Sequence, residues 1–322
     1  MLLLHFYLLL IILIFIFKYF DTNNRIIISL LILVSFSWYH NIDNFSNVQN
    51  NYIDNEIVNN VIKNRDKLQS LIKTYKKDRI NKINIPIYYI NLDKSIDRKE
   101  FMEKQFKDYN ITDYKRVSGV YGKNITNTSE STVDGIKFKN HNPELSLSEI
   151  GCTLSHLKAI KLAFDNNEKM VVIMEDDCSL ELMPLFDSDL KNIISQNIPK
   201  DWGIAQLFTL NCQKVDKYDN YVFADLPQCK NHSSCAYVVN RKGMEIMLNK
   251  YYDKKTNTFL VYGPADLQLF DNTKTYFINI PLFIPADELL PSTIHLDHQN
   301  YHLNSINEVL IKYIYKIENQ IK

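Results

Sequence analysis

The sequence predicts an α/β fold in which a largely parallel, doubly wound sheet carries helices on both faces. Two observations predict it. Apolar runs of strand length, of which Val171–Asp177 is especially rich in β-branched residues, alternate along the chain with runs of helical length. Polar residues directly follow several of these runs, at the point where the strands of an open α/β sheet bind ligands.

The composition is that of a globular protein with no indicated affinity for nucleic acid. The chain has 322 residues, of which 46% are hydrophobic and 23% are charged. Its 37 lysines and arginines are balanced by 37 aspartates and glutamates. Because no extended basic face is indicated, we expect no nucleic acid as partner.

Residues 1–40 predict a membrane anchor with one or two apolar segments. Leu2–Phe17 and Ile26–Tyr39 are almost wholly apolar, and the polar stretch Lys18–Arg25 separates them. A membrane helix needs about 20 residues, a length that the first run approaches and the second does not. If both segments cross, the positive-inside rule places the polar stretch in the cytosol and the large C-terminal part on the lumenal, non-cytosolic side. A single crossing leaves the orientation open.

The rest of the chain divides into a predicted stem and one folded domain. Residues 41–84 are polar and contain neither proline nor glycine, which is typical of a spacer. Residues 85–322 have the length of a single α/β domain.

The folded domain begins with a strand that leads into a helix. Pro86–Leu92 is the predicted strand, and Ser95 is a candidate N-cap for a helix that continues to about Phe106. Such a strand-to-helix turn presents backbone N–H groups to an anion, and Arg98 adds the option of a bidentate phosphate contact. Taken alone, Arg98 is typical of a solvated helix residue.

A short second strand precedes a long loop. Tyr114–Val117 is the predicted strand, and Gly119 and Gly122 then permit a tight turn. Residues 123–145 are polar and predict a long irregular loop.

The helix after this loop carries three polar side chains on one face. Ser146 and Glu149 have the capping-box spacing, and the predicted helix runs to about Phe164. Glu149, Cys152 and His156 follow one another along a single face of it. Taken singly, Glu149 is typical of a helix cap and His156 of a hydrogen-bonded core histidine.

The strand Val171–Asp177 ends in three consecutive carboxylates. Glu175, Asp176 and Asp177 repel one another there, and burying them without compensation is costly. A hard divalent ion such as Mg²⁺ or Mn²⁺ would relieve that repulsion and leave positions open for the diphosphate of a nucleotide. The alternative is a polar strand end with solvated acids.

Further elements complete the alternating pattern. The remaining predicted elements are the helix Leu182–Ile194, the strand Trp202–Leu210, the strand Ser234–Asn240, the helix Arg241–Tyr251, a short helix that starts near Asp266, and the strand Thr275–Ile280. The spacing of Cys229 and Cys235 permits a disulfide, and the sequence leaves that pairing open.

The order of these motifs resembles glycosyltransferase family 25. The resemblance covers roughly residues 86–295 and rests on Tyr89–Asp93 with Arg98, Arg116 with Gly119 and Gly122, Glu149–Cys152 with Ser155 and His156, and Val172–Asp177. This family groups bacterial lipooligosaccharide galactosyltransferases with procollagen galactosyltransferases. The resemblance implies a GT-A-like, Rossmann-type and mostly parallel sheet, a UDP-sugar donor, and Mn²⁺ or Mg²⁺ as cofactor.

The resemblance also implies roles for individual residues. These are Glu175, Asp176 and Asp177 for the metal, Asn91, Leu92, Arg98 and Tyr237 for the nucleotide, and Asp266, Glu149 and His156 for catalysis. Asp266 is expected to be the base that deprotonates the acceptor hydroxyl, and Glu149 is the next candidate. Inversion at the anomeric carbon needs one such base and no covalent intermediate.

The predicted function is therefore that of a membrane-anchored glycosyltransferase. It would transfer galactose or glucose to a hydroxyl of a glycan, glycolipid or protein. A catalytically silent module that binds glycans or a partner protein is the alternative, because each acid could also serve a purely structural purpose. A metal-dependent phosphohydrolase is less favoured, because no histidine-rich ligand set accompanies the acids.

Overall fold

The computed structural model describes residues 54–75, 81–209, 223–225, 233–271, 273–290 and 299–321. Asp54–Lys322 form one compact unit. The predicted anchor, residues 1–40, lies outside the described residues. Among the helices that are described, none combines the length and the apolar character needed to cross a membrane.

Helices and strands alternate along this unit. The helices are α3 (Asn55–Tyr75), α4 (Ile96–Asp108), α5 (Leu147–Asp165), α6 (Leu190–Asn197), α7 (Arg241–Tyr251), α8 (Ala265–Phe270) and α9 (Gln299–Ile321), with 3-10 turns η1 (Gly122–Asn124) and η2 (Met183–Leu185). The strands are β1 (Ile87–Asn91), β2 (Tyr114–Ser118), β3 (Glu130–Val133), β4 (Ile136–Asn140), β5 (Met170–Glu175), β6 (Cys178–Ser179), β7 (Ile204–Gln206), β8 (Phe223–Asp225), β9 (Ala236–Asn240), β10 (Tyr252–Asp253), β11 (Thr258–Val261), β12 (Thr275–Ile278) and β13 (Ile284–Pro285).

The central sheet has the strand order β2-β1-β5-β9-β7-β12-β8. Strands β1, β2, β5, β7 and β12 run in one direction, whereas β9 and β8 run in the other. The predicted α/β class and mostly parallel sheet are therefore confirmed, as a mixed sheet compatible with a Rossmann-like fold. The reversed strand β9 sits in the middle of the sheet. Its direction could not be predicted, because an apolar run such as Ala236–Val239 carries no signal of strand direction.

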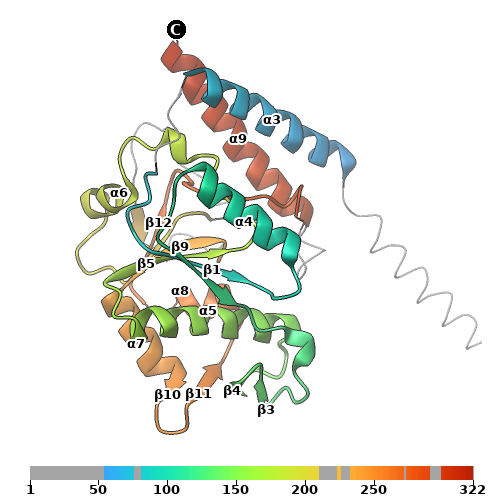
Figure 1. Cartoon of the computed structure of the whole chain (residues 1–322), viewed down its shortest axis with the longest axis vertical. Helices are drawn as coiled ribbons and strands as arrows, with labels where there is room; N and C mark the ends of the chain where they lie inside the picture. The colour runs from blue at the N-terminus through green and yellow to red at the C-terminus, as the bar shows by residue number, and fades with distance from the viewer. Residues whose placement is uncertain are drawn as a thin grey trace, which may run out of the picture. The chain divides into compact units, whose positions relative to one another are not determined.

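Both faces of the sheet are covered, and each face has its own core (Figure 1). Successive residues of β5 point to opposite faces, so Val172 packs in the core on the side of α4 and Ile173 packs in the core on the side of α5. Burial on both faces explains why this strand reads as a continuous apolar run.

The helix α3 belongs to the α/β unit rather than to a stem. It lies along α9, and Figure 1 shows the two helices side by side. Val61 and Leu68 of α3 are fully buried in the same core as Leu303 and Leu310 of α9. The expected stem therefore does not extend to residue 84, because the apolar stripe of this 21-residue helix is buried against a partner.

The expected irregular loop 123–145 is largely structured. It contains η1 and the hairpin β3–β4, and β4 joins β11 and β10 in a four-stranded sheet. Asp134 and Gly135 form the hairpin turn with φ of 49° and 77°. An Asp-Gly pair is typical of a two-residue hairpin turn, so the sequence alone could have predicted this hairpin.

The expected helix Leu182–Ile194 is also wrong in its first half. Residues Met183–Leu185 form the 3-10 turn η2, which contains Pro184. The α-helix α6 begins only after Asp189, whose side chain accepts a hydrogen bond from the Asn192 backbone N–H. A proline and a second capping residue thus split the run.

Candidate active site

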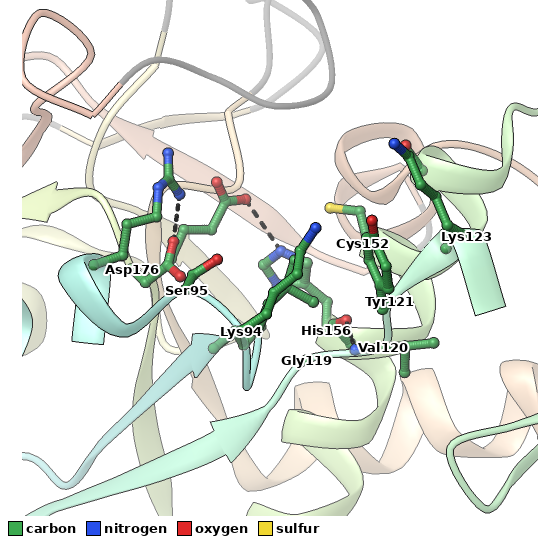
Figure 2. Close-up of a pocket in the computed structure, with 16 residues that line it drawn as sticks. Lys94, Ser95, Gly119, Val120, Tyr121, Lys123, Cys152, His156 and Asp176 are labelled. Carbon is green, nitrogen blue, oxygen red and sulfur yellow. Dashed lines mark hydrogen bonds and ion pairs between the residues drawn. The ribbon is translucent and has the colours of Figure 1, made fainter.

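A cavity of about 390 Å³ opens where β1, β2 and β5 end, beside the N-terminal half of α5 (Figure 2). It is lined by Ile90, Leu92, Lys94, Ser95 and Arg98 from the β1–α4 segment, by Gly119, Val120, Tyr121, Gly122 and Lys123 after β2, by Ser148, Cys152, Ser155 and His156 of α5, and by Glu175 and Asp176 after β5. Its position at the carboxyl ends of parallel strands is the one that the sequence predicts.

Two glycines bring the loop after β2 into contact with α5. A β-carbon on Gly122 would lie 2.1 Å from the Leu147 carbonyl oxygen, and one on Gly151 would lie 2.8 Å from the Val120 carbonyl oxygen. The Ser155 hydroxyl accepts a hydrogen bond from the Val120 N–H (2.8 Å) and donates one to the Gly151 carbonyl (2.7 Å). These contacts fix the loop wall of the cavity, and a larger residue at either glycine would displace it.

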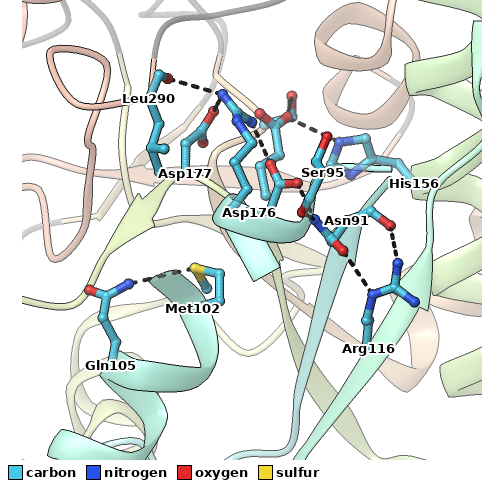
Figure 3. Close-up of polar contacts among 12 residues, drawn as sticks. Asn91, Ser95, Met102, Gln105, Arg116, His156, Asp176, Asp177 and Leu290 are labelled. Carbon is cyan, nitrogen blue, oxygen red and sulfur yellow. Dashed lines mark hydrogen bonds and ion pairs between the residues drawn. The ribbon is translucent and has the colours of Figure 1, made fainter. Parts of the chain in front are cut away.

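Arg98 joins the two aspartates at the end of β5. Figure 3 labels these aspartates, Asp176 and Asp177, together with Leu290. One guanidinium nitrogen bonds to Asp176, and Nη2 lies 3.0 Å from Asp177 Oδ2 and donates to the Leu290 carbonyl at 3.0 Å. Only 14% of the Arg98 side chain is exposed. Burial opposes its charge, but the two carboxylates more than offset that effect and raise the pKa of Arg98 above its ordinary value. Arg98 is therefore part of the site and not a solvated helix residue.

Asn91 connects this cluster to a second arginine. Its Nδ2 donates to Asp176 Oδ2 (2.7 Å) and to the Ser95 carbonyl (3.0 Å), and its Oδ1 accepts from Arg116 Nε (2.8 Å). Arg116 in turn pairs with Asp93 Oδ1 at 2.5 Å. Asn91 is buried and orients Asp176 through the hydrogen bond from its Nδ2. It is not among the residues that line the cavity, whereas its neighbours Leu92 and Ser95 are.

Glu175 turns away from the aspartates and toward α5. Its Oε1 lies 3.2 Å from His156 Nε2 and accepts a hydrogen bond from the Ser234 hydroxyl at 2.5 Å. His156 Nδ1 lies 3.1 Å from the Tyr237 hydroxyl. Burial on its own raises the pKa of Glu175, but the bonds and charge from His156 and Ser234 lower it overall. His156 thus acts as a link between β9 and the acidic end of β5.

Comparison with known proteins identifies the family. A sequence model described as "Glycosyltransferase family 25 (LPS biosynthesis protein)" matches residues 84–266, which is more than half of the chain. The chain belongs to glycosyltransferase family 25. The match contains every residue that lines the cavity.

Individual relatives agree with this assignment. The chain is 32% identical to "Putative glycosyltransferase R655" of Acanthamoeba polyphaga mimivirus over 136 residues, which cover 42% of this chain and 40% of the relative. It is 28% identical to "Procollagen galactosyltransferase 1-B" of Xenopus laevis over 177 residues, or 51% of this chain and 28% of the relative. It is 30% identical to "Glycosyltransferase 25 family member" of Drosophila melanogaster over 193 residues, or 56% and 30%. In each case the matched region spans less than half of the relative.

The acids of this family 25 site fit a hard divalent ion. Asp177 Oδ1 is buried and has no hydrogen-bond partner among the described residues. Burial, followed by the neighbouring carboxylates, raises the pKa of Asp177 well above its ordinary value in spite of Arg98. The carboxylates carry more negative charge than the single guanidinium of Arg98 offsets. Clustered carboxylate oxygens of this kind are the ligands that Mn²⁺ and Mg²⁺ prefer. Glu175 and Asp176 line the cavity, whereas Asp177 is buried and is not among the residues that line it.

The two proposed bases occupy different positions. Glu149 completes the predicted capping box, because its Oε2 accepts from the Ser146 N–H at 2.8 Å while its own N–H donates to Ser146 Oγ at 3.2 Å. Asp266 lies in the first turn of α8 and is half-buried. It contributes to the raised pKa of Cys152, after burial and Glu175, and to the raised pKa of Tyr237, after burial, Glu175 and Cys152. Neither acid is among the described residues that line the cavity.

Several residues at the site were not singled out from the sequence. Lys94, Tyr121 and Lys123 line the cavity, and Lys94 Nζ lies 3.7 Å from the centre of the Tyr121 ring. Ser234 lies two residues before the start of β9, and its hydroxyl donates a hydrogen bond to Glu175. Exposed lysines are common in this sequence and a lone serine has no signature, so only the fold identifies them.

Proposed function

We propose that this chain is a metal-dependent enzyme that transfers a hexose, either galactose or glucose, from a UDP-sugar to a hydroxyl group. The main support for this proposal is the cluster of Glu175, Asp176, Asp177 and Arg98 at one end of a cavity in a family 25 glycosyltransferase. The names of the procollagen galactosyltransferase relatives favour galactose. A glycan, a glycolipid or a protein would supply the acceptor hydroxyl.

The metal would be held by carboxylate oxygens at the end of β5. Asp176 and Asp177 are the proposed ligands, with Glu175 beside them, and Mn²⁺ is favoured over Mg²⁺ by the resemblance alone. A bound ion would offset the negative charge that develops on the departing diphosphate. Lys94, Arg98 and Lys123 add positive charge around the same cavity, which suits a donor with two phosphates.

The base is proposed to be Asp266, with Glu149 as the next candidate. Asp266 belongs to α8 and is not one of the three acids at the end of β5, and a carboxylate that is not bound to a metal is the better proton acceptor. Glu149 is engaged in both hydrogen bonds of its capping box. Attack by the deprotonated hydroxyl on the anomeric carbon would break the bond to the diphosphate and invert the configuration.

Replacement of Asp266 tests this role. Asp266→Asn should lower sugar transfer far more than it weakens UDP-sugar binding, and binding can be measured by calorimetry in the absence of acceptor. A purely structural role in the first turn of α8 would instead cost up to about 1 kcal/mol of stability and leave turnover per folded molecule unchanged. That second result would transfer the role to Glu149, which Glu149→Gln then tests.

A second candidate function has one observation in its favour. Arg98 already pairs with Asp176 and Asp177, so the acids are partly neutralised without a metal. This arrangement would suit a catalytically silent module of the same fold that binds a glycan or a partner protein.

One experiment separates the two candidates. Purified protein is incubated with a panel of UDP-sugars and Mn²⁺, with and without glycan, glycolipid and peptide acceptors, and the release of UDP is measured. Acceptor-stimulated release that EDTA abolishes supports the transferase. UDP-sugar binding with no release under any condition supports the silent module.

A further inference from the structure

Three side chains at the cavity have the arrangement of a site for a softer metal ion than the one discussed above. We propose that Cys152, His156 and Glu175 bind a zinc-class divalent ion in a three-ligand site that opens into the cavity. The proposal goes beyond the proposed function, because the ion would bind whether or not the cavity turns over a UDP-sugar. It concerns the donor atoms Sγ, Nε2 and Oε1, and not the aspartates.

The backbone brings these ligands together. Cys152 and His156 are four residues apart on α5, so they lie on one face of the helix, one turn from each other. Glu175 is the last residue of β5 and turns toward that face. One ligand atom from each residue lies within 4.8 Å of the other two, and His156 Nε2 and Glu175 Oε1 are 3.2 Å apart.

This spacing is close to that of a tetrahedral zinc ion. With bonds of about 2.0 Å to nitrogen and oxygen and about 2.3 Å to sulfur, the ligand atoms of such an ion stand roughly 3.3–3.6 Å apart. The His156–Glu175 pair is already close to this distance, so only the Cys152 thiol has to approach, by at most about 1.3 Å. A change of side-chain torsion on this scale needs no movement of the backbone.

Second partners already hold two of the three ligands in place. The Tyr237 hydroxyl contacts His156 Nδ1, which leaves Nε2 directed at Glu175. The Ser234 hydroxyl donates to the Glu175 oxygen that would bind the ion. Hydrogen bonds of this kind orient the ligands of natural metal sites and select the histidine tautomer. Here they hold a histidine of which 1% is exposed, so its ring has little freedom to turn away.

The site is open on one side. Cys152, His156 and Glu175 all line the cavity, and we expect the remaining coordination position to face it. Three protein ligands and one open position are typical of zinc sites that also bind a water or a substrate oxygen. An oxygen of water or of a phosphate group is therefore the expected fourth ligand.

The chemistry of the donors selects the class of ion. Thiolate and imidazole favour Zn²⁺ or Co²⁺ over Mn²⁺, whereas the oxygen set of Asp176 and Asp177 favours the harder ions. Binding forms bonds from the ion to Cys152 Sγ, His156 Nε2 and Glu175 Oε1. The S–H bond breaks and its proton leaves to solvent, while the hydrogen on Nε2 that now faces Glu175 is replaced by one on Nδ1, where the Tyr237 hydroxyl can accept it. No oxidation or reduction accompanies the step.

Cobalt provides a direct test that needs neither donor nor acceptor. The full chain is stripped with a chelator and titrated with Co²⁺. We expect near-ultraviolet absorption from thiolate-to-cobalt charge transfer together with the intense visible bands of four-coordinate Co²⁺. Cys152→Ser should abolish the charge-transfer absorption, and Zn²⁺ should displace the bound cobalt.

Matched variants make the result specific. Cys178→Ala removes another buried free thiol of the same unit and should leave the spectrum unchanged. The double variant Cys212→Ala/Cys229→Ala removes both cysteines that lie outside the described residues and should also leave the spectrum unchanged. Tyr237→Phe keeps all three ligands but removes the partner of His156, so the affinity for Co²⁺ should fall by about 10–100-fold.

Two outcomes would overturn the proposal. One is a charge-transfer band that persists in Cys152→Ser. The other is an unchanged affinity in Tyr237→Phe, which is informative even if the cysteine variant does not fold. Because the spectra are recorded without UDP-sugar, a failure of the metal site is distinguishable from a failure of the proposed transferase activity.

Discussion

At the scale of single residues, Arg98 controls how much uncompensated negative charge the cavity contains. It bonds to Asp176 and Asp177 and is anchored by the Leu290 carbonyl. One guanidinium offsets one carboxylate, so the pair retains a negative charge that a cation or a proton must neutralise. The orphaned oxygen Oδ1 of Asp177 marks the place where that requirement is greatest.

The proposed role of Asp177 in holding the metal gives the first prediction. Asp177→Asn should reduce metal-dependent sugar transfer roughly 100-fold or more, equivalent to about 2.7 kcal/mol of transition-state stabilisation. Initial rates at saturating Mn²⁺ measure the effect. Asp165→Asn, which alters an exposed carboxylate paired with Lys161 on α5, is the control and should retain full activity. Full activity in Asp177→Asn would show that the ion is held elsewhere.

The same carboxylate should make stability depend on pH. Burial raises the folded-state pKa of Asp177, so the folded protein holds a proton that the unfolded chain releases above about pH 4. The free energy of unfolding should therefore fall as the pH rises from about 4, until the raised pKa is passed. Asp177→Asn has no proton to lose there and should show a shallower decline in denaturant titrations at several pH values. Identical slopes in the two proteins would contradict the raised pKa.

Single residues also show what the sequence could and could not predict. The position of Glu175, Asp176 and Asp177 at the end of a buried strand was predictable, because uncompensated charges are costly to bury and therefore mark the end of an apolar run. The sequence could not predict that Glu175 turns toward His156 while the two aspartates turn toward Arg98. The difference depends on which helix covers each face of the sheet, and strand periodicity alone does not contain that information.

At the scale of elements, α3 and the segment around β13 support the acidic end of the cavity from outside the matched family region. Arg65 of α3 donates to the Pro285 carbonyl at 3.1 Å, and its Nε lies 2.5 Å from Glu288. It also pairs with Glu181. The Ala286 N–H donates to the Asp177 carbonyl at 2.9 Å, and the Leu290 carbonyl of the same segment accepts a hydrogen bond from Arg98. By holding Pro285 and Glu288, α3 therefore supports the segment that contacts both Asp177 and Arg98.

Two charge removals on α3 should therefore differ in effect. Arg65→Met leaves the fully buried Glu288 without its cation and should destabilise the fold by about 3–5 kcal/mol. Lys67→Met removes an exposed pair with Glu318 on α9 and should cost under about 1 kcal/mol. Chemical denaturation measures both. Equal losses would mean that α3 is held by its apolar face alone and not by Arg65.

Elements differ in how clearly the sequence indicates them. The turn at Asp134 and Gly135 had a readable signal, and the hairpin β3–β4 could have been predicted from it. The packing of α3 on α9 could not, because a weak apolar stripe does not say which helix, more than 200 residues away, will cover it. Tertiary contacts decide whether such a stripe becomes a spacer or part of the core.

At the scale of the whole molecule, the residues of the cavity and their supports all fall within Asp54–Lys322, which form one compact unit. A boundary at residue 84 would remove α3, expose apolar side chains of α9 and leave Glu288 unpaired. Residue 54 is therefore the latest start that keeps α3 whole, whereas the sequence alone favours a start some thirty residues later.

The last prediction concerns the division of labour between the two ends of the chain. We expect residues 1–40 to attach the protein to membranes and to be dispensable for chemistry, because two apolar runs lie there and no residue of the cavity does. A chain of residues 54–322 should therefore remain in the supernatant after high-speed centrifugation and release UDP at the rate of the full-length protein. The full-length protein should pellet with membranes and require detergent for release. If residues 54–322 also pellet, a second attachment surface must exist on the α/β unit, since no described helix there is long and apolar enough to cross a bilayer. If they stay soluble but lose activity while retaining the same thermal unfolding midpoint, the N-terminal segment contributes to the chemistry and the proposed division is wrong.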